Sequence, residues 1–548
     1  TNENLEQSKN KEQLLIISIG YAACHWCHVM EKECFEDEEV AAVMNASFTS
    51  YKIDREELPA VDAYYMQALQ IMTKQGGWPL NIVALPNGLP VWGATYVPKE
   101  QWIEVLQQLA QLFKNDKEKM LEYAQQLSNG ITFANNTLAL YPKKDETIDI
   151  KPLIEKWKKS FDLDFGGYQR APKCMMPTNL NFLLQYGTYK KDSELLSYVD
   201  NTLTKMAWGG LFDVVEGGFS RYSVDHKWHI PHFEKMLYDN AQLLTVYTQN
   251  YLQTNNELHK EVVAKTLEFI NSNWKDNSGG YYAAYDADSK NTSGNLIEGA
   301  YYSWKKEELL QVIPKNDWNL FADLFSVNED GYWEEEQTYV FIQYKPLETF
   351  ATKHAIPIEY LKEKKKNWES ILYNERLKRT KPLLDDKIII SWNAQLLSGF
   401  INASKIIDDE LLEKNILSLA AFLMNKAYTI KLGRAFKNGN IYIDGTLEDY
   451  AFTIKAFIDL FNKTQNIQYI EFARLLTFEV IDNLFKEEQG FFQSQDNEAI
   501  GTVFEIEDNV IPSANAIMSR NLFYIGLIYN NKHFINTAKQ MTARVIGN

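Results

Sequence analysis

Cysteine is scarce in this sequence, with four residues among 548. Secreted domains that depend on disulfides have a much higher cysteine density, so these four do not form a disulfide framework. Cys34 and Cys174 lie among apolar neighbours and are expected to be small buried hydrophobes. The polar start, Thr1 to Asn4, has no apolar core of a signal peptide. We therefore expect the protein to work in a reducing cytoplasm.

Positive charge is also in deficit, because 56 Lys and Arg face 73 Asp and Glu, a formal net charge of −17. Nucleic acids and anionic lipid surfaces are both bound through basic side chains. We therefore exclude nucleic acid and membrane surfaces as partners. The sequence also has no run of about eighteen apolar residues, the length that a membrane-spanning helix needs.

What the chain does have is enough apolar material for more than one core. Hydrophobic residues make up 45% and aromatic residues 13% of its length. Single cores stop growing at about 250–300 residues, so two or more domains are expected. A polar stretch interrupts the pattern of apolar residues after the first 127 positions. We predict a first domain over 1–127, a linker over 128–149 and a second domain over 150–548.

The first hundred residues alternate between strand and helix patterns. Short apolar runs bounded by glycine or polar residues predict strands, and apolar positions three and four apart predict helices. Asn87-Gly88 marks a tight hairpin turn. The expected elements are strand 14–19, helix 24–45, strand 48–54, helix 60–72, strands 80–85 and 91–96, and helix 100–113. This order, with a cysteine pair opening the first helix, predicts an α/β thioredoxin-like domain.

The Cys24-His25-Trp26-Cys27 motif begins the first predicted helix. Free N–H groups and the helix dipole stabilise a thiolate there, and a protonated His25 acts in the same direction. We expect Cys24 to be the exposed attacking thiol and Cys27 the more buried resolving thiol. Trp78-Pro79 stands where a cis-proline loop would face the two cysteines, so a cis bond is predicted there.

Three other interpretations of the motif stay open. The C-x-x-C-H pattern that ends at His28 also matches covalent haem attachment, which needs export machinery. Cys24, Cys27 and His28 are metal-ligating residue types, although a structural zinc site needs a fourth ligand and Cys34 lies about two helical turns away. The two cysteines can also be vestigial or merely packed. Our prediction is that the protein has no cofactor and no metal.

Beyond residue 150 helical patterns dominate, and a glycine–aromatic motif recurs between them. The marker glycines follow one another at steps of 51, 62, 51, 108 and 51 residues, and the long step corresponds to two periods. A pair of helices plus a loop fits this period, and such pairs bury their faces on their neighbours. We therefore predict an all-α (α/α)6 toroid. The markers are Gly167, Gly218, Gly280, Gly331, Gly439 and Gly490.

Long motifs in both parts of the chain resemble the group formed by spermatogenesis-associated protein 20 and bacterial YyaL-like proteins. The resemblance implies a thioredoxin-like domain fused to a six-hairpin barrel of the kind found in glycosidases and N-acylglucosamine 2-epimerases. It implies no particular reaction. The motifs are Gly20 to Glu31, Asp54 to Glu57, Gln75 to Leu80, Arg170 to Lys173, Gly217 to Asp225, Pro231 to Asn240, Asp286 to Ser289, Asp385 to Lys387, Ser391 to Asn393 and Leu447 to Tyr450.

Polar and aromatic residues collect in the loops that a closed toroid would gather at one mouth. Such a mouth suits sugars, because aromatic rings stack on C–H faces while carboxylates and amides bind hydroxyls. The catalytic candidates are Cys24 and Cys27 in the first domain, and His232, Glu234 and Asp239 in the second. The binding candidates are Trp78, Pro79, Arg221, Asp225, Trp228, Asp286, Asp288, Trp392, Asn393, Asp449 and Tyr450.

Two reactions compete for the mouth of the toroid. Glycoside hydrolysis needs two carboxyl groups about 5–5.5 or 6.5–9.5 Å apart, one of them protonated. Epimerisation needs a base beside a carbon acidified by a carbonyl, a role that suits His232. A purely structural role is as well supported for Asp225, His232 and Asp239. Asp286 with Asp288 can cap a loop or bind a cation, and Asp385-Asp386 is expected to form a helix cap with a salt bridge.

The leading hypothesis is thiol–disulfide redox chemistry at Cys24 and Cys27, in a thioredoxin-fold module fused to a carbohydrate-active-enzyme-like barrel of unknown substrate. One alternative is sugar epimerase or glycosidase activity in the barrel, with a vestigial or regulatory redox module. The other is a non-catalytic scaffold that binds a glycan or a protein. The partner is then a carbohydrate or a protein disulfide, and the sequence indicates no oligomeric state.

Overall fold

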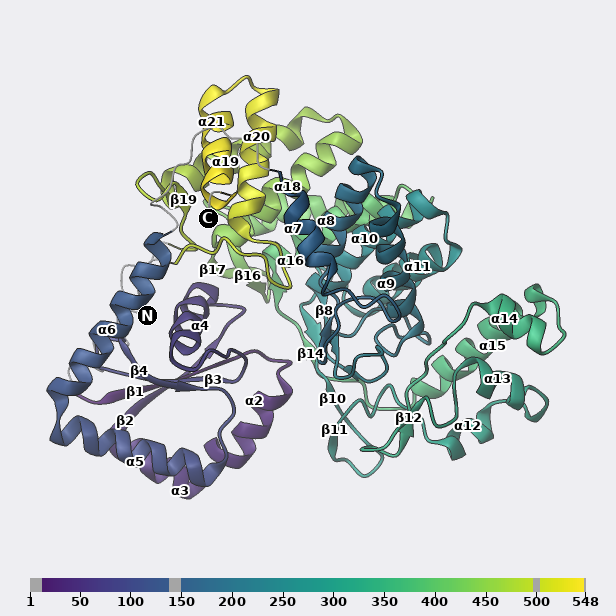
Figure 1. Cartoon of the computed structure of the whole chain (residues 1–548), viewed down its shortest axis with the longest axis horizontal. Helices are drawn as coiled ribbons and strands as arrows, with labels where there is room; N and C mark the ends of the chain where they lie inside the picture. Colours follow the sequence, from purple (N-terminus) through teal and green to yellow (C-terminus); the bar gives the residue numbers. More distant parts are fainter. Residues whose placement is uncertain (1–11, 138–148, 496–502, 547–548) are drawn as a thin grey trace.

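The computed structural model describes residues 12–137, 149–495 and 503–546, and its N-terminal part is the predicted α/β domain (Figure 1). Four strands form one sheet in the order β2-β1-β3-β4. β1 is parallel to β2 and antiparallel to β3, which is antiparallel to β4. The strands are β1 (Leu14–Gly20), β2 (Phe48–Asp54), β3 (Leu80–Ala84) and β4 (Pro90–Ala94).

Helices cover both faces of this sheet, because β1 is apolar on both of its faces. Leu14 and Ile16 join the core beneath α3 and α5, whereas Leu15, Ile17 and Ile19 join the core beneath α4 and α6. The helices are α2 (His25–Met30), α3 (Glu38–Ser47), α4 (Pro59–Thr73), α5 (Lys99–Asn115) and α6 (Lys117–Thr137). The prediction of a thioredoxin-like domain is confirmed.

Two predicted boundaries differ from the structure. The helix expected over 24–45 is divided, because Asp37 accepts hydrogen bonds from Glu39 N and Val40 N and so starts α3 separately from α2 and a π-helical turn, η1 (Glu31–Phe35). The linker was expected from residue 128, but α6 continues to Thr137 and buries Ile131 against the sheet domain. Residues 138–148 lie outside the described part of the chain.

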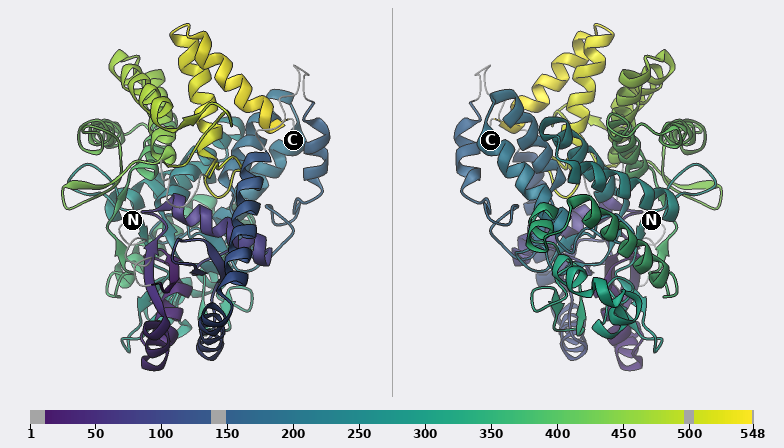
Figure 2. Two further views of the ribbon diagram at one scale, coloured as in Figure 1. Left: turned by 90° about the vertical axis from the view of Figure 1, so that its left-hand side faces the viewer. Right: turned by 90° about the vertical axis from the view of Figure 1, so that its right-hand side faces the viewer.

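The second domain is a toroid of helical pairs, as predicted. The first helices of successive pairs pack side by side, α8 on α10, α10 on α16, α16 on α18 and α18 on α20. The described residues supply five pairs and α7. Both side views place the last pair at the end of the molecule away from the sheet domain (Figure 2). The helices are α7 (Lys151–Lys158), α8 (Pro177–Lys190), α9 (Ser193–Trp208), α10 (Leu237–Thr254), α11 (Glu257–Asn273), α16 (Ile390–Ala403), α17 (Glu410–Phe422), α18 (Leu447–Thr464), α19 (Ile467–Leu484), α20 (Ala514–Ile528) and α21 (Lys532–Ile546).

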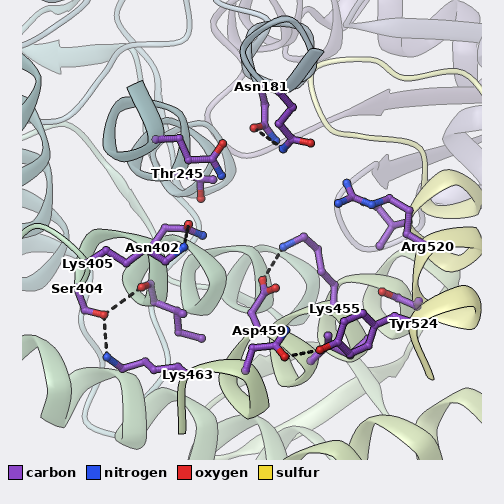
Figure 3. Close-up of a pocket in the computed structure, with 17 residues that line it drawn as sticks. Asn181, Thr245, Asn402, Ser404, Lys405, Lys455, Asp459, Lys463, Arg520 and Tyr524 are labelled. Carbon is purple, nitrogen blue, oxygen red and sulfur yellow. Dashed lines mark hydrogen bonds and ion pairs between the residues drawn. The ribbon is translucent and has the colours of Figure 1, made fainter. Parts of the chain in front are cut away.

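The first helices of all five pairs line one central cavity of about 570 Å³ (Figure 3). Their side chains there are mostly amides, hydroxyls and lysines. Lys455 contacts Asp459 at 2.6 Å, and Lys463 donates a hydrogen bond to Ser404 at 2.9 Å. This shared lining is direct evidence that the pairs surround a common centre.

The glycine–aromatic motif joins one helical pair to the next at three places. An asparagine near the start of the following helix brackets the aromatic residue, accepting from its N–H and donating to its C=O at 2.7–3.1 Å. The motif therefore marks a structural joint rather than a ligand contact. The three joints are Phe219 with Asn240, Tyr281 with Asn393, and Phe492 with Asn515.

Two of the marker glycines lie in additions to the toroid. Gly331 is in an inserted unit that has its own apolar core and projects to the right in Figure 1. Gly439 is in the turn between β16 (Gly433–Lys437) and β17 (Asn440–Asp444). The inserted helices are α12 (Lys306–Val312), α13 (Trp318–Leu324), α14 (Leu347–Lys353) and α15 (Ile358–Arg376).

Throughout the described ranges, each helix is either too short or too polar to cross a membrane.

Candidate functional site in the cleft between the two domains

Cys24 and Cys27 form a disulfide at the start of α2, with their Cα atoms 5.2 Å apart. Cys24 is the N-cap residue, and its Sγ accepts a hydrogen bond from Cys27 N at 3.3 Å. Gly20 leaves room for this pair, since a Cβ there would lie 2.7 Å from the Sγ of Cys27. The Trp78–Pro79 bond is cis, as predicted. The motif thus opens the helix in the expected way.

The disulfide lies beside a cleft of about 260 Å³ that both domains line. Cys24, Trp26 and Trp78 contribute from the sheet domain. Cys24 is only 2% exposed, whereas Cys27 is partly exposed. The prediction that Cys24 is the more exposed thiol is therefore wrong for this disulfide-bonded state. The reason is that the toroid closes over the motif, but Cys24 still faces the cleft. The toroid residues in the lining are Cys174 to Pro177, Arg221, Tyr222, His232, Glu234, Asp239 and Val510.

The two histidines of the motif contact two aspartates of the toroid. Nδ1 of His25 lies 2.9 Å from Oδ1 and 3.1 Å from Oδ2 of Asp288. Nδ1 of His28 lies 3.6 Å from Oδ2 of Asp286. The hydrogen bond to Asp288 raises the pKa of His25, and burial raises the pKa of Asp286 to about 6. Two predicted binding residues of the toroid therefore belong to the surroundings of the redox motif.

A second contact between the domains is centred on Tyr21, three residues before Cys24. Its hydroxyl donates to Glu234 Oε1 at 3.1 Å and Oε2 at 3.2 Å. Arg221 donates through Nη1 to the Tyr21 oxygen and, at 3.0 Å, to Oε2 of Glu234. The structure thus brings together the predicted residues Arg221 and Glu234. Tyr21 was not singled out from the sequence, although it lies in the Gly20 to Glu31 motif.

His232 is held between two carboxylates. Its Nε2 lies 2.8 Å from Oε1 of Glu234, and its Nδ1 lies 2.6 Å from Oε1 of Glu298. Burial alone would lower the pKa of His232, but the two carboxylates outweigh it and raise the pKa to about 10. An imidazolium whose two N–H groups are both engaged has no lone pair with which to accept a proton. This arrangement argues against His232 as the base of an epimerase. Glu298 was missed because it lies 66 residues away, at the end of the short strand β11 (Leu296–Glu298).

Asp239 and Glu234 line the same cleft with their acidities shifted in opposite directions. Asp239 is 2% exposed, and its Oδ2 has no hydrogen-bond partner in the described part of the chain. Burial raises the pKa of Asp239 to about 8, against the opposing charge of Arg221. Burial would also raise the pKa of Glu234, but His232 and Arg221 lower it below the usual value. Asp239 therefore favours the protonated form, whereas Glu234 favours the ionised carboxylate.

The Asp54 to Glu57 motif anchors the two domains to each other. The ammonium group of Lys387 contacts Asp54 and lies 3.1 Å from both Glu56 and Asp385. Arg434 donates through Nε to the carbonyl oxygen of Glu56 at 2.8 Å. Burial, with neighbouring carboxylates, raises the pKa of Glu56 despite the Lys387 charge. The expected salt bridge of Asp385 to Lys387 is present, and the same ammonium group also contacts Asp54 and Glu56 of the sheet domain. The expected helix cap is wrong, because Asp385 lies in a short strand and the next helix, α16, is N-capped by Ile389.

Two predicted aromatic platforms lie in the core instead of the cleft. Trp228 is fully buried and donates through Nε1 to the carbonyl oxygen of Phe165 at 2.8 Å. Trp392 is 3% exposed and packs edge to face on Tyr238, with the ring centroids 4.8 Å apart. Neither is among the residues that line the cleft. Because both rings pack against other protein groups, they do not provide a surface for a sugar.

Four other predicted binding residues hold backbone or neighbouring side chains in place. Asp225 accepts hydrogen bonds from three N–H groups of its own loop at 2.6–3.2 Å. Asn393 brackets Tyr281, and Asp449 completes a capping box at the start of α18. Tyr450 donates to Glu479 at 2.6 Å. These contacts correspond to the structural role that the sequence had left open for Asp225.

One family model matches the part of the sequence that forms the sheet domain. A family model for thioredoxin DsbH-like proteins, described as a protein of unknown function (DUF255), matches residues 1–132. Among solved structures, cellobiose 2-epimerase from Bacillus thermoamylovorans aligns with a TM-score of 0.45 and 12% identity, covering 71% of this chain and 82% of that chain. Both the identity and the TM-score are low, so this likeness supports no conclusion about function.

Two curated relatives match through both domains. Spermatogenesis-associated protein 20 of Homo sapiens is 30% identical over 569 residues, which cover 95% of this chain and 72% of the human protein. An uncharacterized protein of Caenorhabditis elegans is 31% identical over 578 residues, covering 98% of this chain and 78% of the nematode protein. Because the match to the human protein is 30% identical and covers 95% of this chain and 72% of that protein, the chain belongs to the spermatogenesis-associated protein 20 family.

Proposed function

We propose that the chain catalyses thiol–disulfide exchange through Cys24 and Cys27 within the cleft between its domains. The observation that carries the proposal is the position of Cys24, which N-caps α2 and also lines the cleft that holds Arg221 and His232. A thiol at a helix start is stabilised as a thiolate by the free N–H groups there. The protonated form of His25 adds a positive charge next to it.

The reaction balances as a two-electron exchange. In the reduced protein, the Cys24 thiolate attacks one sulfur of a substrate disulfide, forms a mixed disulfide and releases the other substrate sulfur as a thiolate. The Cys27 thiolate then attacks Sγ of Cys24 and releases the second substrate thiolate. The substrate disulfide is reduced to a dithiol, and the protein is left with the Cys24–Cys27 disulfide seen here. An external dithiol returns it to the reduced form by the same two steps.

The cleft sets the size of the substrate. A volume of about 260 Å³ beside a cysteine that is 2% exposed admits a small disulfide, or a disulfide on an extended peptide. A disulfide buried in a folded protein does not fit. Trp26, which is 50% exposed, offers an apolar contact beside the cleft. The carboxyl and guanidinium groups on the toroid side favour a substrate that also carries hydrogen-bonding groups.

The test uses the reduced full chain with oxidised glutathione, and it follows free thiols and mixed disulfides by mass spectrometry. We expect Cys24→Ser to abolish exchange and Cys27→Ser to stop after a mixed disulfide on Cys24. Cys174→Ser is the matched control, because Cys174 lines the same cleft outside the disulfide, and it should keep full exchange. The proposal fails if Cys24→Ser still exchanges or if the mixed disulfide forms on Cys174.

A second candidate function is acid–base chemistry in the toroid, and the opposite pKa shifts of Asp239 and Glu234 favour it. A protonated carboxyl group beside an ionised one is the arrangement that glycoside hydrolysis requires. A screen of disaccharides and monosaccharides for hydrolysis and epimerisation tests this, with Asp239→Asn and His232→Ala as variants. Hydrolysis lost in Asp239→Asn supports this alternative, and no turnover of any sugar favours the binding scaffold.

A further inference from the structure

His28, Asp286 and Asp288 form a cluster at the boundary between the domains that the redox chemistry does not use. One nitrogen of His28 and one carboxylate oxygen of each aspartate all lie within 4.8 Å of one another. Among residues 12–137, 149–495 and 503–546, this is the one group of three His, Cys, Asp or Glu side chains with ligand atoms so close. The cluster includes a histidine, so it differs from an ordinary acidic patch.

The distance between the side chains of Asp286 and His28 is the first indication of a bound ion. Oδ1 of Asp286 accepts a hydrogen bond from the N–H of Asp288 at 2.9 Å, which orients Oδ2 toward His28. Oδ2 then lies 3.6 Å from Nδ1 of His28, longer than a hydrogen bond. Asp286 is 3% exposed, and a single hydrogen bond to one of its oxygens compensates only part of the cost of burying its charge. A cation between the three groups would remove that cost.

A second sign is the support behind the cluster. Nδ1 of His25 lies 2.9 and 3.1 Å from the two oxygens of Asp288 and holds this carboxylate in place. Ligands of metal ions in proteins are oriented by such outer hydrogen bonds. The cluster therefore has three candidate ligands, and His25 positions one of them, Asp288. The two histidines come from the sheet domain and the two aspartates from the toroid.

We propose that His28, Asp286 and Asp288 bind a divalent transition-metal ion of the Zn²⁺ or Mn²⁺ type. One imidazole nitrogen and two carboxylate oxygens suit these ions, whereas Mg²⁺ and Ca²⁺ prefer oxygen ligands alone. With three protein ligands the site is of the open kind, in which water would take the remaining position, and not a closed structural zinc site. Bonds of about 2.0–2.2 Å require small rotations of the three side chains toward the centre. The ion joins α2 to the toroid and neutralises two buried carboxylates beside the cleft. Its ligands are distinct from the two cysteines, which are bonded to each other here.

The experiment is calorimetric titration of the full, oxidised chain with ZnCl₂. The expected result is one equivalent bound, with at least about tenfold weaker binding in His28→Gln and in Asp286→Asn. His25→Gln should weaken binding by about tenfold to a hundredfold, the range for groups that orient ligands. Asp386→Asn is the control, because Asp386 is an exposed aspartate paired with Lys437 and should leave binding unchanged.

A double variant, Cys24→Ser with Cys27→Ser, separates this site from a thiol site. Retention of one equivalent by the double variant supports the proposal, and its loss overturns it, because the cysteines would then be the ligands. Binding by His28→Gln equal to that of the parent chain also overturns it. The side chain of His28 is 28% exposed, so His28→Gln spares the core. A rise in melting temperature with Zn²⁺ that is absent in His28→Gln confirms the site independently of heats of binding.

Discussion

Nδ1 of His25 lies 2.9 Å from Oδ1 of Asp288, although 263 residues separate them in the sequence. This contact places a toroid carboxylate directly behind the redox motif. The pKa of His25 therefore depends on the second domain. A thioredoxin-like module without a toroid lacks this contact. The fusion of the two domains therefore changes the protonation of a residue inside the redox motif.

Replacing Asp288 tests this dependence. Because the hydrogen bond to Asp288 raises the pKa of His25, Asp288→Asn should lower it toward the ordinary value. The pair stabilises the fold below pH 6.5 and loses its contribution as the pH rises through the raised pKa. The variant should therefore lose about 1 kcal/mol of stability at pH 6 and less at pH 9. Imidazole NMR titrations measure the pKa, with His25→Gln to identify the signal. An unchanged titration of His25 would contradict the prediction.

Gly20→Ala tests the packing of Cys27 on the end of β1. The added Cβ would lie 2.7 Å from the sulfur of Cys27, so the disulfide or the strand must shift. We expect the free energy of unfolding of the oxidised chain to fall by about 1–3 kcal/mol, as for other overpacked sites. Gly130→Ala is the control, because nothing lies within 4 Å of a Cβ there and alanine favours the helix. Equal effects in urea unfolding for the two variants would disprove the steric explanation.

Lys387→Met tests the anchor between the domains. Removal of this buried ammonium group leaves the carboxylates of Asp54, Glu56 and Asp385 facing one another. We expect a loss of about 3–5 kcal/mol at neutral pH, as when one partner of a buried ion pair is deleted. The loss should be larger at pH 9, because Glu56 gives up its proton near its raised pKa of about 8 and then depends on the Lys387 charge. Lys437→Met, which removes an exposed lysine, should cost about 0.5 kcal/mol or less at both pH values.

Local patterns were sufficient to predict the sheet domain and the helical pairs. The apolar run of β1, the cysteine pair and the proline at 79 are short-range signals, because each depends on neighbours within a few residues. The divided helix after Met30 was missed, since the cap formed by Asp37 resembles an acidic residue inside a helix. The marker glycines predicted helical pairs correctly, but Gly331 and Gly439 belong to additions that share the motif.

The site was harder to predict because it depends on contacts between distant segments. Trp228 and Trp392 have the residue type of a sugar platform, and only the packing of the folded chain shows that other groups cover them. Tyr21 and Glu298 were missed for the converse reason. Neither has a distinctive pattern of neighbours in the sequence. In the folded chain Tyr21 contacts Glu234, and Glu298 contacts His232. Burial and pairing of this kind are properties of the folded molecule.

Asp239→Asn tests the most strongly shifted carboxyl group of the cleft. Its pKa of about 8 in the folded chain exceeds the usual value of 3.8 because the group is buried. The folded state therefore holds this proton more tightly than the unfolded state, and folding stability falls as pH rises through that window. The slope is about 1.4 kcal/mol per pH unit for one proton. Asparagine keeps the shape without the charge, so the variant should be the more stable form at pH 8 and show no such slope.

Urea unfolding of the parent chain and Asp239→Asn at pH 5, 6, 7 and 8 measures this effect directly. The difference in unfolding free energy between the two proteins should grow with each step in pH and level off above about 8. Asp386→Asn, which removes an exposed carboxylate, should run parallel to the parent chain at all four values. Parallel curves for Asp239→Asn would mean that the group is ionised in the folded chain. It would then be unable to act as the acid of a hydrolase, and the second candidate function would fail with it.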